Sequence, residues 1–433
     1  MPMKINIWSK ACGGLLLLCL TFGGCASELP EENSQGNSQV FVLSEEDIWG
    51  CAAPDTVSGE ILAPESEPAD DAEGHTADQE AYSFLEEGSG YARADLSEAE
   101  RIWYDEMEQI LGGYQLQVEL SEDGLAAGLT EGNIDRIFQC VLNDHPELFY
   151  VDGYSYTKYT RYGNDNEITS IEFSGRYGVD QETAVLHREQ IREETDRILK
   201  GIDTDASEYD KVKYVYDTLI RETDYQLESP DNQNIYSVFV NHVSVCQGYA
   251  KATQYLLNRL GVECALVLGT VNTGEGHAWN LVNIDGSYYY VDTTWGDVSY
   301  QQEGDEAATL HIQPDINYDY LNVTSAELFR THTISGDIVM PVCIDTAANY
   351  YVREGALFAS YDREQMTLLF ERMAGEGRND VTIKCANADC YREVIEALID
   401  RKEIFNYLSG MGSTVAFIQN DTQLSLTFWV TNE

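Results

Sequence analysis

The dipeptide Asp285-Gly286 stands between two runs rich in apolar and aromatic residues, 277–284 and 287–292. Asp-Gly favours a type I′ turn, because both central residues of that turn need positive φ. If the loop holds only these two residues, the runs pair as a β-hairpin. Asp292 then lies diagonal to His277 on the same face, about 7–8 Å away at the backbone, and the two side chains can meet.

A helix is expected upstream of this hairpin. From Cys246 to Leu260, apolar and small residues recur at helical spacing, and Gly261 is a plausible stop. Ser244 is a candidate N-cap. Cys246 would lie in the first turn, where the macrodipole and free N–H groups favour a thiolate. The same N–H groups could bind an oxyanion.

Cys246, His277 and Asp292 together supply a thiol, an imidazole and a carboxylate. These are the parts of a cysteine nucleophile with its base and its orienting group. Taken singly, each has an ordinary structural explanation: a lone helical Cys is usually a small buried hydrophobe. Their order and spacing favour a catalytic constellation.

At these residues the chain resembles the transglutaminase-like superfamily, whose members share a papain-like core. The resemblance covers about a fifth of the chain, from Tyr209 to Trp295, and its short intervals suit the compact bacterial members. It implies an α+β fold with the nucleophile helix packed on an antiparallel sheet. It also implies Cys246 as nucleophile, His277 as base and acid, and Asp292 as orienter. The matching motifs are Val245-Cys246-Gln-Gly-Tyr-Ala-Lys251, Gly276-His277-Ala-Trp-Asn280 and Val291-Asp292-Thr-Thr-Trp295.

The second oxyanion donor stays open. The backbone N–H of Cys246 is the expected first donor, and Tyr236 and Gln247 are candidates for the second. Trp279 and Trp295 flank the triad in sequence and could wall an acyl tunnel, although aromatic residues beside a hairpin are more often core.

The first 24 residues have the pattern of a secretory signal. Two lysines precede a short apolar run, and Gly-Gly precedes Cys25. This resembles a bacterial lipobox and predicts cleavage before Cys25, lipidation of its thiol, and anchoring on the extracytoplasmic face of the cell membrane. Secretion after cleavage at Ala26 is the alternative.

Charge and composition exclude some classes of partner and site. The formal net charge of −49 argues against nucleic-acid binding. Residues 25–95, rich in Glu, Asp, Ser, Gly and Pro, are expected to form a flexible acidic tether. Cys385 and Cys390 lack a second Cys/His pair, so neither a metal nor a cofactor is expected.

Three folded domains are expected after the tether: a small α+β domain at 96–203, the catalytic core at 204–345 and a small α/β domain at 346–433. Expected strands include 114–120 in the first domain and 350–359 in the last. His145 shows no obvious partner. His332 resembles a recurrent family Thr-His pair and is given no catalytic role while His277 is present.

The leading functional hypothesis is a cysteine-dependent acyl-transfer enzyme that acts on protein or peptide amides at the cell surface, as a peptidase, an amidase or a transglutaminase. Hydrolysis and amine transfer share their first half-reaction, so the triad cannot separate them. The alternative from another class is a non-catalytic surface binding module that keeps the fold. A sugar-handling deglycosylase ranks last, since no further motif favours it.

Overall fold

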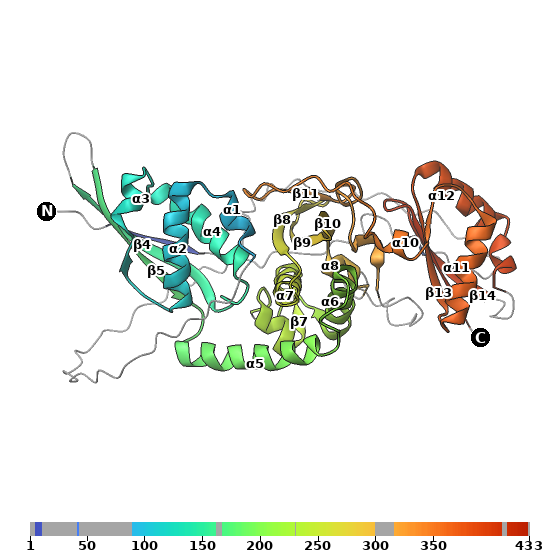
Figure 1. The fold of residues 1–433 in the computed structure, drawn as a ribbon, viewed down its shortest axis with the longest axis horizontal. Coiled ribbons are helices and arrows are strands. Elements are labelled where there is room, and N and C mark those ends of the chain that lie inside the picture. The colour runs from blue at the N-terminus through green and yellow to red at the C-terminus, as the bar shows by residue number, and fades with distance from the viewer. Residues whose placement is uncertain are drawn as a thin grey trace, which may run out of the picture.

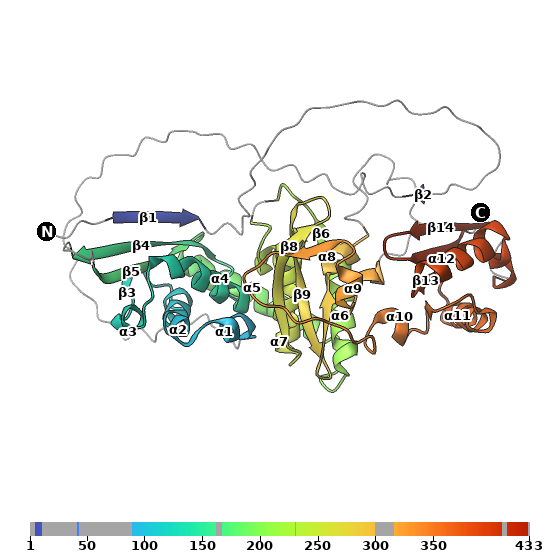
Figure 2. The ribbon, with the colours of Figure 1, turned by 90° about the horizontal axis from the view of Figure 1, so that it is seen from above.

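The computed structural model describes residues 5–10, 41–42, 89–161, 167–229, 231–298, 316–408 and 414–431. Cys25 and most of residues 1–95 lie outside this part, so the signal, the lipid anchor and the tether stay predictions. Three units follow one another along the long axis of the molecule (Figures 1 and 2). We call them the N-terminal unit (89–203), the core unit (204–345) and the C-terminal unit (346–431).

The N-terminal unit packs helices against a sheet of order β1-β4-β5-β3. Its own strands are β3 (Val118–Glu119), β4 (Val151–Arg161) and β5 (Glu167–Tyr177). The strand β1 (Ile5–Lys10) pairs with β4 but lies within the segment predicted to be a cleaved signal. Its helices are α1 (Tyr91–Asp95), α2 (Glu98–Gly112), α3 (Glu122–Ala126), η1 (Glu131–Asn133), α4 (Ile134–Asp144) and α5 (Gln181–Leu199). Helical structure thus begins at Tyr91, five residues before the predicted start of this domain at residue 96. A capping box of Ser97 and Glu100 starts α2.

The core unit is built on an antiparallel sheet of order β10-β9-β8-β11, with α7 packed on β8 and β9. The strands of the sheet are β8 (Cys264–Val271), β9 (Gly276–Ile284), β10 (Ser287–Val291) and β11 (His332–Ile334). The helices are α6 (Glu208–Glu222), η2 (Ser237–Asn241), α7 (Cys246–Arg259), α8 (Thr293–Gly296), η5 (Tyr318–Tyr320) and α9 (Ser325–Leu328). A small parallel pair joins β6 (Asp224–Tyr225) to β7 (Val243–Ser244). This confirms the predicted α+β core with a helix on an antiparallel sheet.

The C-terminal unit has a sheet of order β12-β13-β15-β14-β2. Its own strands are β12 (Leu357–Phe358), β13 (Asp380–Cys385), β14 (Thr414–Asn420) and β15 (Ser425–Thr431). The two-residue strand β2 (Phe41–Val42), from the predicted tether, pairs with β14. Its helices are α10 (Tyr350–Arg353), α11 (Arg363–Gly375), α12 (Ala388–Ile395), η6 (Glu396–Asp400) and η7 (Glu403–Asn406). Its buried side chains belong to the same hydrophobic cluster as those of α6 and α7.

Two predicted strands are wrong in most of their length. In the range 114–120 the only strand is β3, and Tyr114 and Gln117, with positive φ of 56° and 55°, turn the chain before it. In the range 350–359 the chain forms α10 before the short β12, and Asn349 caps this helix with its side chain.

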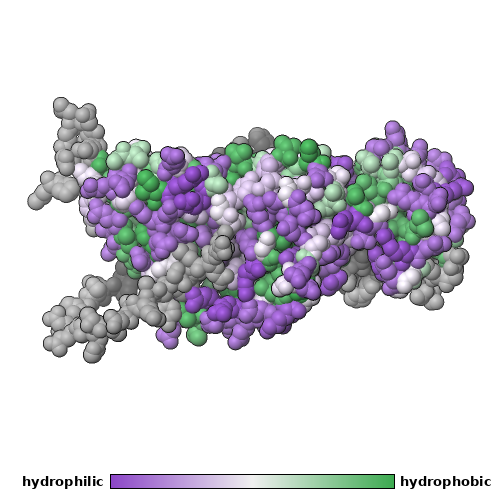
Figure 3. Space-filling model, viewed as in Figure 1, coloured by the Kyte–Doolittle hydropathy of each residue, from purple (hydrophilic) through white to green (hydrophobic). Residues whose placement is uncertain are grey.

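The surface agrees with the acidic composition. The face in Figure 3 is mostly hydrophilic, and hydrophobic residues occur there in separate patches. Across the described ranges, no helix combines the length and apolar character that a membrane span requires.

Candidate active site

The hairpin of β9 and β10 brings His277 and Asp292 together. Asp285 and Gly286 have positive φ, 52° and 85°, as a type I′ turn requires, and the strands pair in the register that a two-residue loop dictates. Asp292 follows β10 directly. Its Oδ2 atom lies 2.7 Å from Nε2 of His277. The diagonal contact predicted from the turn is therefore present.

His277 lies between the carboxylate and the thiol. Its residue is only 6% exposed. Burial alone disfavours an imidazolium, but the charge and hydrogen bond of Asp292, with a hydrogen bond to Cys246, raise the pKa of His277 to about 10. Because Nε2 faces Asp292, Nδ1 is the ring nitrogen that is left for the interaction with Cys246. The ring thus bridges the other two groups.

Cys246 is the first residue of α7, as the helical periodicity predicts. In the first turn of α7 the N–H of Gly248 donates to the carbonyl of Val245 at 2.9 Å. The N–H groups of Cys246 and Gln247, which lack an acceptor within the helix, are candidates for binding an anion. The predicted cap is wrong: Val245 is the N-cap residue and makes no side-chain cap bond. The Ser244 hydroxyl instead donates to the carbonyl of Asn232 at 2.7 Å.

Cys246 differs from the other cysteines of the described part in its exposure. It is partly exposed, whereas the remaining free cysteines of these residues are buried; they are Cys140, Cys264, Cys343, Cys385 and Cys390. Burial raises the pKa of Cys140 to about 12 and that of Cys343 to about 11, which keeps them as thiols. Within the described ranges, Cys246 is therefore the thiol most open to a substrate or reagent.

The carboxylate of Asp292 is fully buried and accepts three hydrogen bonds. Oδ1 accepts from the backbone N–H of Trp295 at 3.0 Å. Oδ2 accepts from Nε2 of His277 at 2.7 Å and from Nε2 of His332 at 3.0 Å. Burial opposes ionisation, but attraction to His277 and the hydrogen bonds of both histidines outweigh it and lower the pKa of Asp292.

The sequence did not predict the contact between His332 and Asp292. β11 pairs with β8 at the edge of the sheet, with His332 opposite Val271, and this long-range pairing delivers His332 to the carboxylate. The available signal was the Thr331-His332 dipeptide, which carries no information about its spatial partner.

The same three side chains are the ones in the described part with the spacing of metal ligands. One ligand atom from each of His277, Asp292 and His332 lies within 4.8 Å of the others. Both imidazoles, however, direct Nε2 to one carboxylate oxygen at hydrogen-bond distance. A bound zinc needs nitrogen ligands at about 2.0 Å and would displace both hydrogen bonds. The geometry fits a hydrogen-bonded cluster better than a metal centre.

The four weaker candidates lie in different places. Tyr236 engages α5: its hydroxyl donates to Gln190 and its ring stacks on His187 at 3.9 Å between centroids. Gln247 is the second residue of α7, next to the nucleophile. Trp279 and Trp295 are buried. Their ring centroids lie 5.0 and 4.6 Å from that of His332 and about 6 Å from that of His277. The two indole rings therefore pack against both imidazoles.

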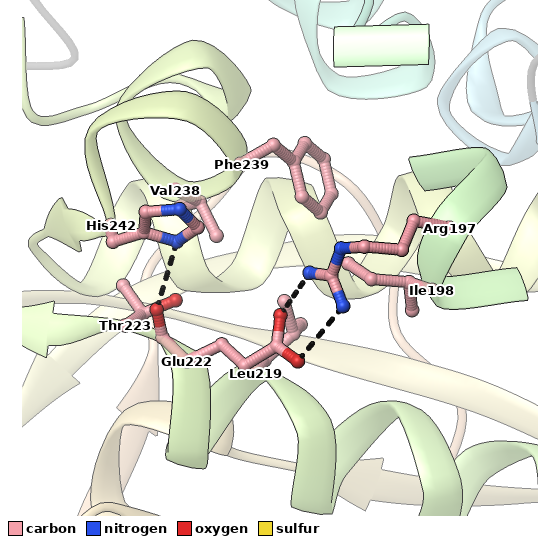
Figure 4. A pocket seen from close by; sticks show the side chains of 8 residues that line it. All are labelled: Arg197, Ile198, Leu219, Glu222, Thr223, Val238, Phe239 and His242. Carbon is pink, nitrogen blue, oxygen red and sulfur yellow. Dashed lines mark hydrogen bonds and ion pairs between the residues drawn. The ribbon is translucent and has the colours of Figure 1, made fainter. Parts of the chain in front are cut away.

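A small pocket lies among α5, α6 and η2 (Figure 4). Its charged lining is already paired, because Arg197 contacts the carboxylate of Glu222. Nδ1 of His242 lies 3.1 Å from the backbone oxygen of Glu222. None of the triad residues lines this pocket, so it is separate from the candidate active site.

Residues 195–293 match the model of the transglutaminase-like superfamily. This range contains α6, α7 and the hairpin, and with them Cys246, His277 and Asp292. The resemblance read from the sequence motifs is thus confirmed for the core unit.

Other comparisons are partial. No curated protein matches the chain. A solved TGase is 18% identical, with a TM-score of 0.23, over 32% of this chain and 43% of its own. A proposed cysteine protease of Cytophaga hutchinsonii is 15% identical, with a TM-score of 0.22, over 31% and 60%. Menin, whose structure shows a binding site for the Mixed Lineage Leukemia protein, is 17% identical, with a TM-score of 0.22, over 46% and 44%. The chain thus spans less than two thirds of each, and these likenesses say nothing of what it does.

Proposed function

We propose that this chain, whose core unit is transglutaminase-like, is a cysteine-dependent acyl-transfer enzyme that acts on protein or peptide amides through a thioester. The observation that carries the proposal is the arrangement in which His277 is hydrogen-bonded to the buried Asp292 and interacts with Cys246. Each group in this arrangement has the neighbour that its chemical role requires.

The first half-reaction follows from these contacts. The Cys246 sulfur, with its proton held by Nδ1 of His277, attacks the amide carbon, and the carbonyl electrons move to the oxygen. The backbone N–H of Cys246 in the first turn of α7 supplies a donor for this oxyanion. When the carbonyl re-forms, the C–N bond breaks, the leaving nitrogen takes the proton from His277, and a thioester remains on Cys246.

The second half-reaction returns the free thiol. Water or a primary amine gives a proton to His277 and attacks the thioester carbon, and the sulfur leaves as the thiolate. We favour water, because hydrolysis needs no acceptor pocket. The proposed substrates are proteins or peptides, in keeping with a family that contains cysteine peptidases and acyltransferases.

We also propose that the enzyme is anchored outside the cell through a lipid on Cys25. The support is the signal-like pattern of the first 24 residues and the acidic stretch after it. Cys25→Ser is expected to move the protein from the membrane fraction to the soluble fraction. An unchanged membrane fraction would contradict the anchor and favour secretion after cleavage at Ala26.

The test of the proposed function uses the full chain, a mixture of glutamine-containing peptides and a primary amine, with mass spectrometry as the readout. Wild type is expected to release products and to carry an acyl group on Cys246, and Cys246→Ala is expected to do neither. Amine incorporation without competing hydrolysis would reverse the preference for water. Absence of turnover together with full biological activity of Cys246→Ala would contradict the enzyme and favour the surface binding module.

A further inference from the structure

The C-terminal unit is hydrogen-bonded to η5, which precedes His332 in the sequence. The buried carboxylate of Asp319, in η5 of the core unit, accepts three hydrogen bonds from the C-terminal unit. The donors are Nζ of Lys384 at 3.0 Å, Nδ2 of Asn420 at 3.1 Å and the hydroxyl of Ser425 at 2.6 Å. Because a buried carboxylate is costly without such donors, this contact fixes η5 against the C-terminal unit.

Tyr320, the residue after Asp319, touches the candidate active site through its backbone. Its carbonyl oxygen accepts the backbone N–H of Asp292 at 3.0 Å. Its ring packs edge-on against Trp295, with centroids 4.9 Å apart. The backbone N–H of Trp295 in turn donates to Oδ1 of Asp292. A shift of η5 would therefore move the backbone of Asp292 and one donor to its carboxylate.

The side chain of Tyr320 belongs to a second connection, which we call the Gln423–His332 chain. Nε2 of Gln423 donates to the Tyr320 hydroxyl at 3.3 Å, and this hydroxyl lies 3.5 Å from Oγ1 of Thr331. Oγ1 of Thr331 lies 2.8 Å from Nδ1 of His332. The last step is the bond from Nε2 of His332 to Oδ2 of Asp292. All five residues are buried.

The protonation states of the groups determine which atom donates in each hydrogen bond of the Gln423–His332 chain. An ionised carboxylate only accepts, so Nε2 of His332 must carry a proton. Burial lowers the pKa of His332, and in the neutral ring Nδ1 is then an acceptor. Oγ1 of Thr331 lies 2.8 Å from Nδ1 and 3.3 Å from the backbone oxygen of Leu328, so its proton goes to the nearer acceptor, Nδ1. Tyr320 can then donate to Thr331. Every donor from Gln423 onward is therefore directed towards Asp292.

We propose that His332 is a positioning residue for Asp292, and that the C-terminal unit holds His332 in its Nε2–H form through Gln423. The proposal rests on the proposed function, in which Asp292 orients His277. It assigns the C-terminal unit a part in preparing the triad, although that unit contributes no reacting group. Loss of the Gln423–His332 chain would leave the Asp292 carboxylate with one imidazole donor, that of His277. The carboxylate could then rotate away from His277.

The test compares variants of the full chain by the pH dependence of iodoacetamide labelling at Cys246. Thr331→Val removes the donor to His332 without changing side-chain shape, and Gln423→Leu removes the link to the C-terminal unit. Thr382→Val is the matched control, because its hydroxyl pairs with Thr427 at 2.9 Å within the C-terminal sheet. Thr331→Ser is a second control, because it keeps the hydroxyl that Thr331→Val removes.

Thr331→Val and Gln423→Leu are expected to slow labelling at pH 6 by about tenfold, which corresponds to about 1.4 kcal/mol, because each variant loses one buried hydrogen bond. Thr331→Ser and Thr382→Val are expected to match wild type. If labelling collapses in His277→Ala but the profiles of Thr331→Val, Gln423→Leu and His332→Ala equal that of wild type, the positioning role is wrong.

A second readout needs no reactive thiol. In protein with ¹⁵N-labelled histidine, NMR is expected to show His332 with its proton on Nε2, and Gln423→Leu is expected to shift the signals of His332 and His277. An ordinary thiol profile in wild type would contradict the proposed function alone. A proton on Nδ1 of His332, or signals unmoved by Gln423→Leu, would overturn the inference itself.

Discussion

Two buried histidine–carboxylate clusters occur in this molecule with opposite composition. In the N-terminal unit one imidazole is shared by two carboxylates: Nε2 of His145 lies 2.8 Å from Glu108 and Nδ1 lies 2.7 Å from Glu147. In the core unit one carboxylate, that of Asp292, is shared by two imidazoles. The two clusters use the same chemical groups and differ in what they leave available.

His145 has no ring nitrogen left. Burial disfavours its charge, but the hydrogen bonds and charges of Glu108 and Glu147 outweigh burial and raise the pKa of His145 to about 10. It is therefore a fixed imidazolium with a structural role. In His277, Nε2 is hydrogen-bonded to Asp292, and the other ring nitrogen is left for the interaction with Cys246. A raised pKa alone thus does not identify a catalytic histidine; a nitrogen facing a nucleophile does.

The largest expected effect separates the two histidines by turnover. His277→Ala is expected to lower the amide turnover rate by about 10³–10⁴-fold, because the thiol loses its base and its proton donor. His145→Ala is expected to retain the wild-type turnover per folded molecule. Peptide turnover followed by mass spectrometry checks both. Equal losses in the two variants would erase the distinction.

Asp292→Asn tests whether the shared carboxylate supports His277 by its charge. The amide keeps the shape but neither attracts an imidazolium nor accepts at both former positions, so turnover is expected to fall by about 10²-fold. The optimum is also expected to move to lower pH, because the pKa of His277 falls towards its ordinary value. A pH–rate profile measures this shift. An unchanged pH–rate profile would show that the charge of Asp292 does not affect His277.

His145→Gln is expected to lower the free energy of unfolding near neutral pH by about 3 kcal/mol, because the buried Glu147 and the partly exposed Glu108 then lose the imidazolium that they share. Since the folded pKa of His145 lies above its unfolded value of about 6.5, this stabilisation is complete below pH 6.5 and is lost as pH rises towards 10. Urea unfolding at a series of pH values measures it. A difference between wild type and variant that grows from pH 7 to 10 would contradict the imidazolium.

The smallest expected effect concerns metal removal. Because His277 and His332 donate to Asp292 at hydrogen-bond distance, a chelator is expected to leave both Cys246 labelling and thermal stability unchanged. Dialysis against EDTA followed by both measurements checks this. A loss that zinc restores would replace the hydrogen-bonded cluster with a metal centre.

Local signals predicted the parts of the site that lie close in sequence. The Asp285-Gly286 turn fixes the register of its hairpin, and the register alone brings His277 to Asp292. Helical periodicity places Cys246 at the first residue of α7. These predictions hold because turn chemistry and periodicity act over a few residues.

Contacts between distant segments could not be predicted in this way. Glu108 and His145 are brought together by packing of α2 on α4, and His332 reaches Asp292 through an edge strand. Tyr114 likewise follows its tertiary partners rather than the alternating pattern, since its ring stacks on that of Tyr177 at 3.9 Å. In each case the decisive partner lies far along the chain, where no periodic pattern reports it.

The pairing of Cys246 with His277 is tested by the pH dependence of Cys246 alkylation in the full chain, measured on the Cys246 peptide, with His277→Ala as the comparison. A paired thiolate should give fast labelling that persists below pH 7 in wild type and collapses in the variant. Slow labelling with an ordinary thiol profile, the same in both proteins, would contradict a thiolate paired with His277, and with it the proposed enzyme.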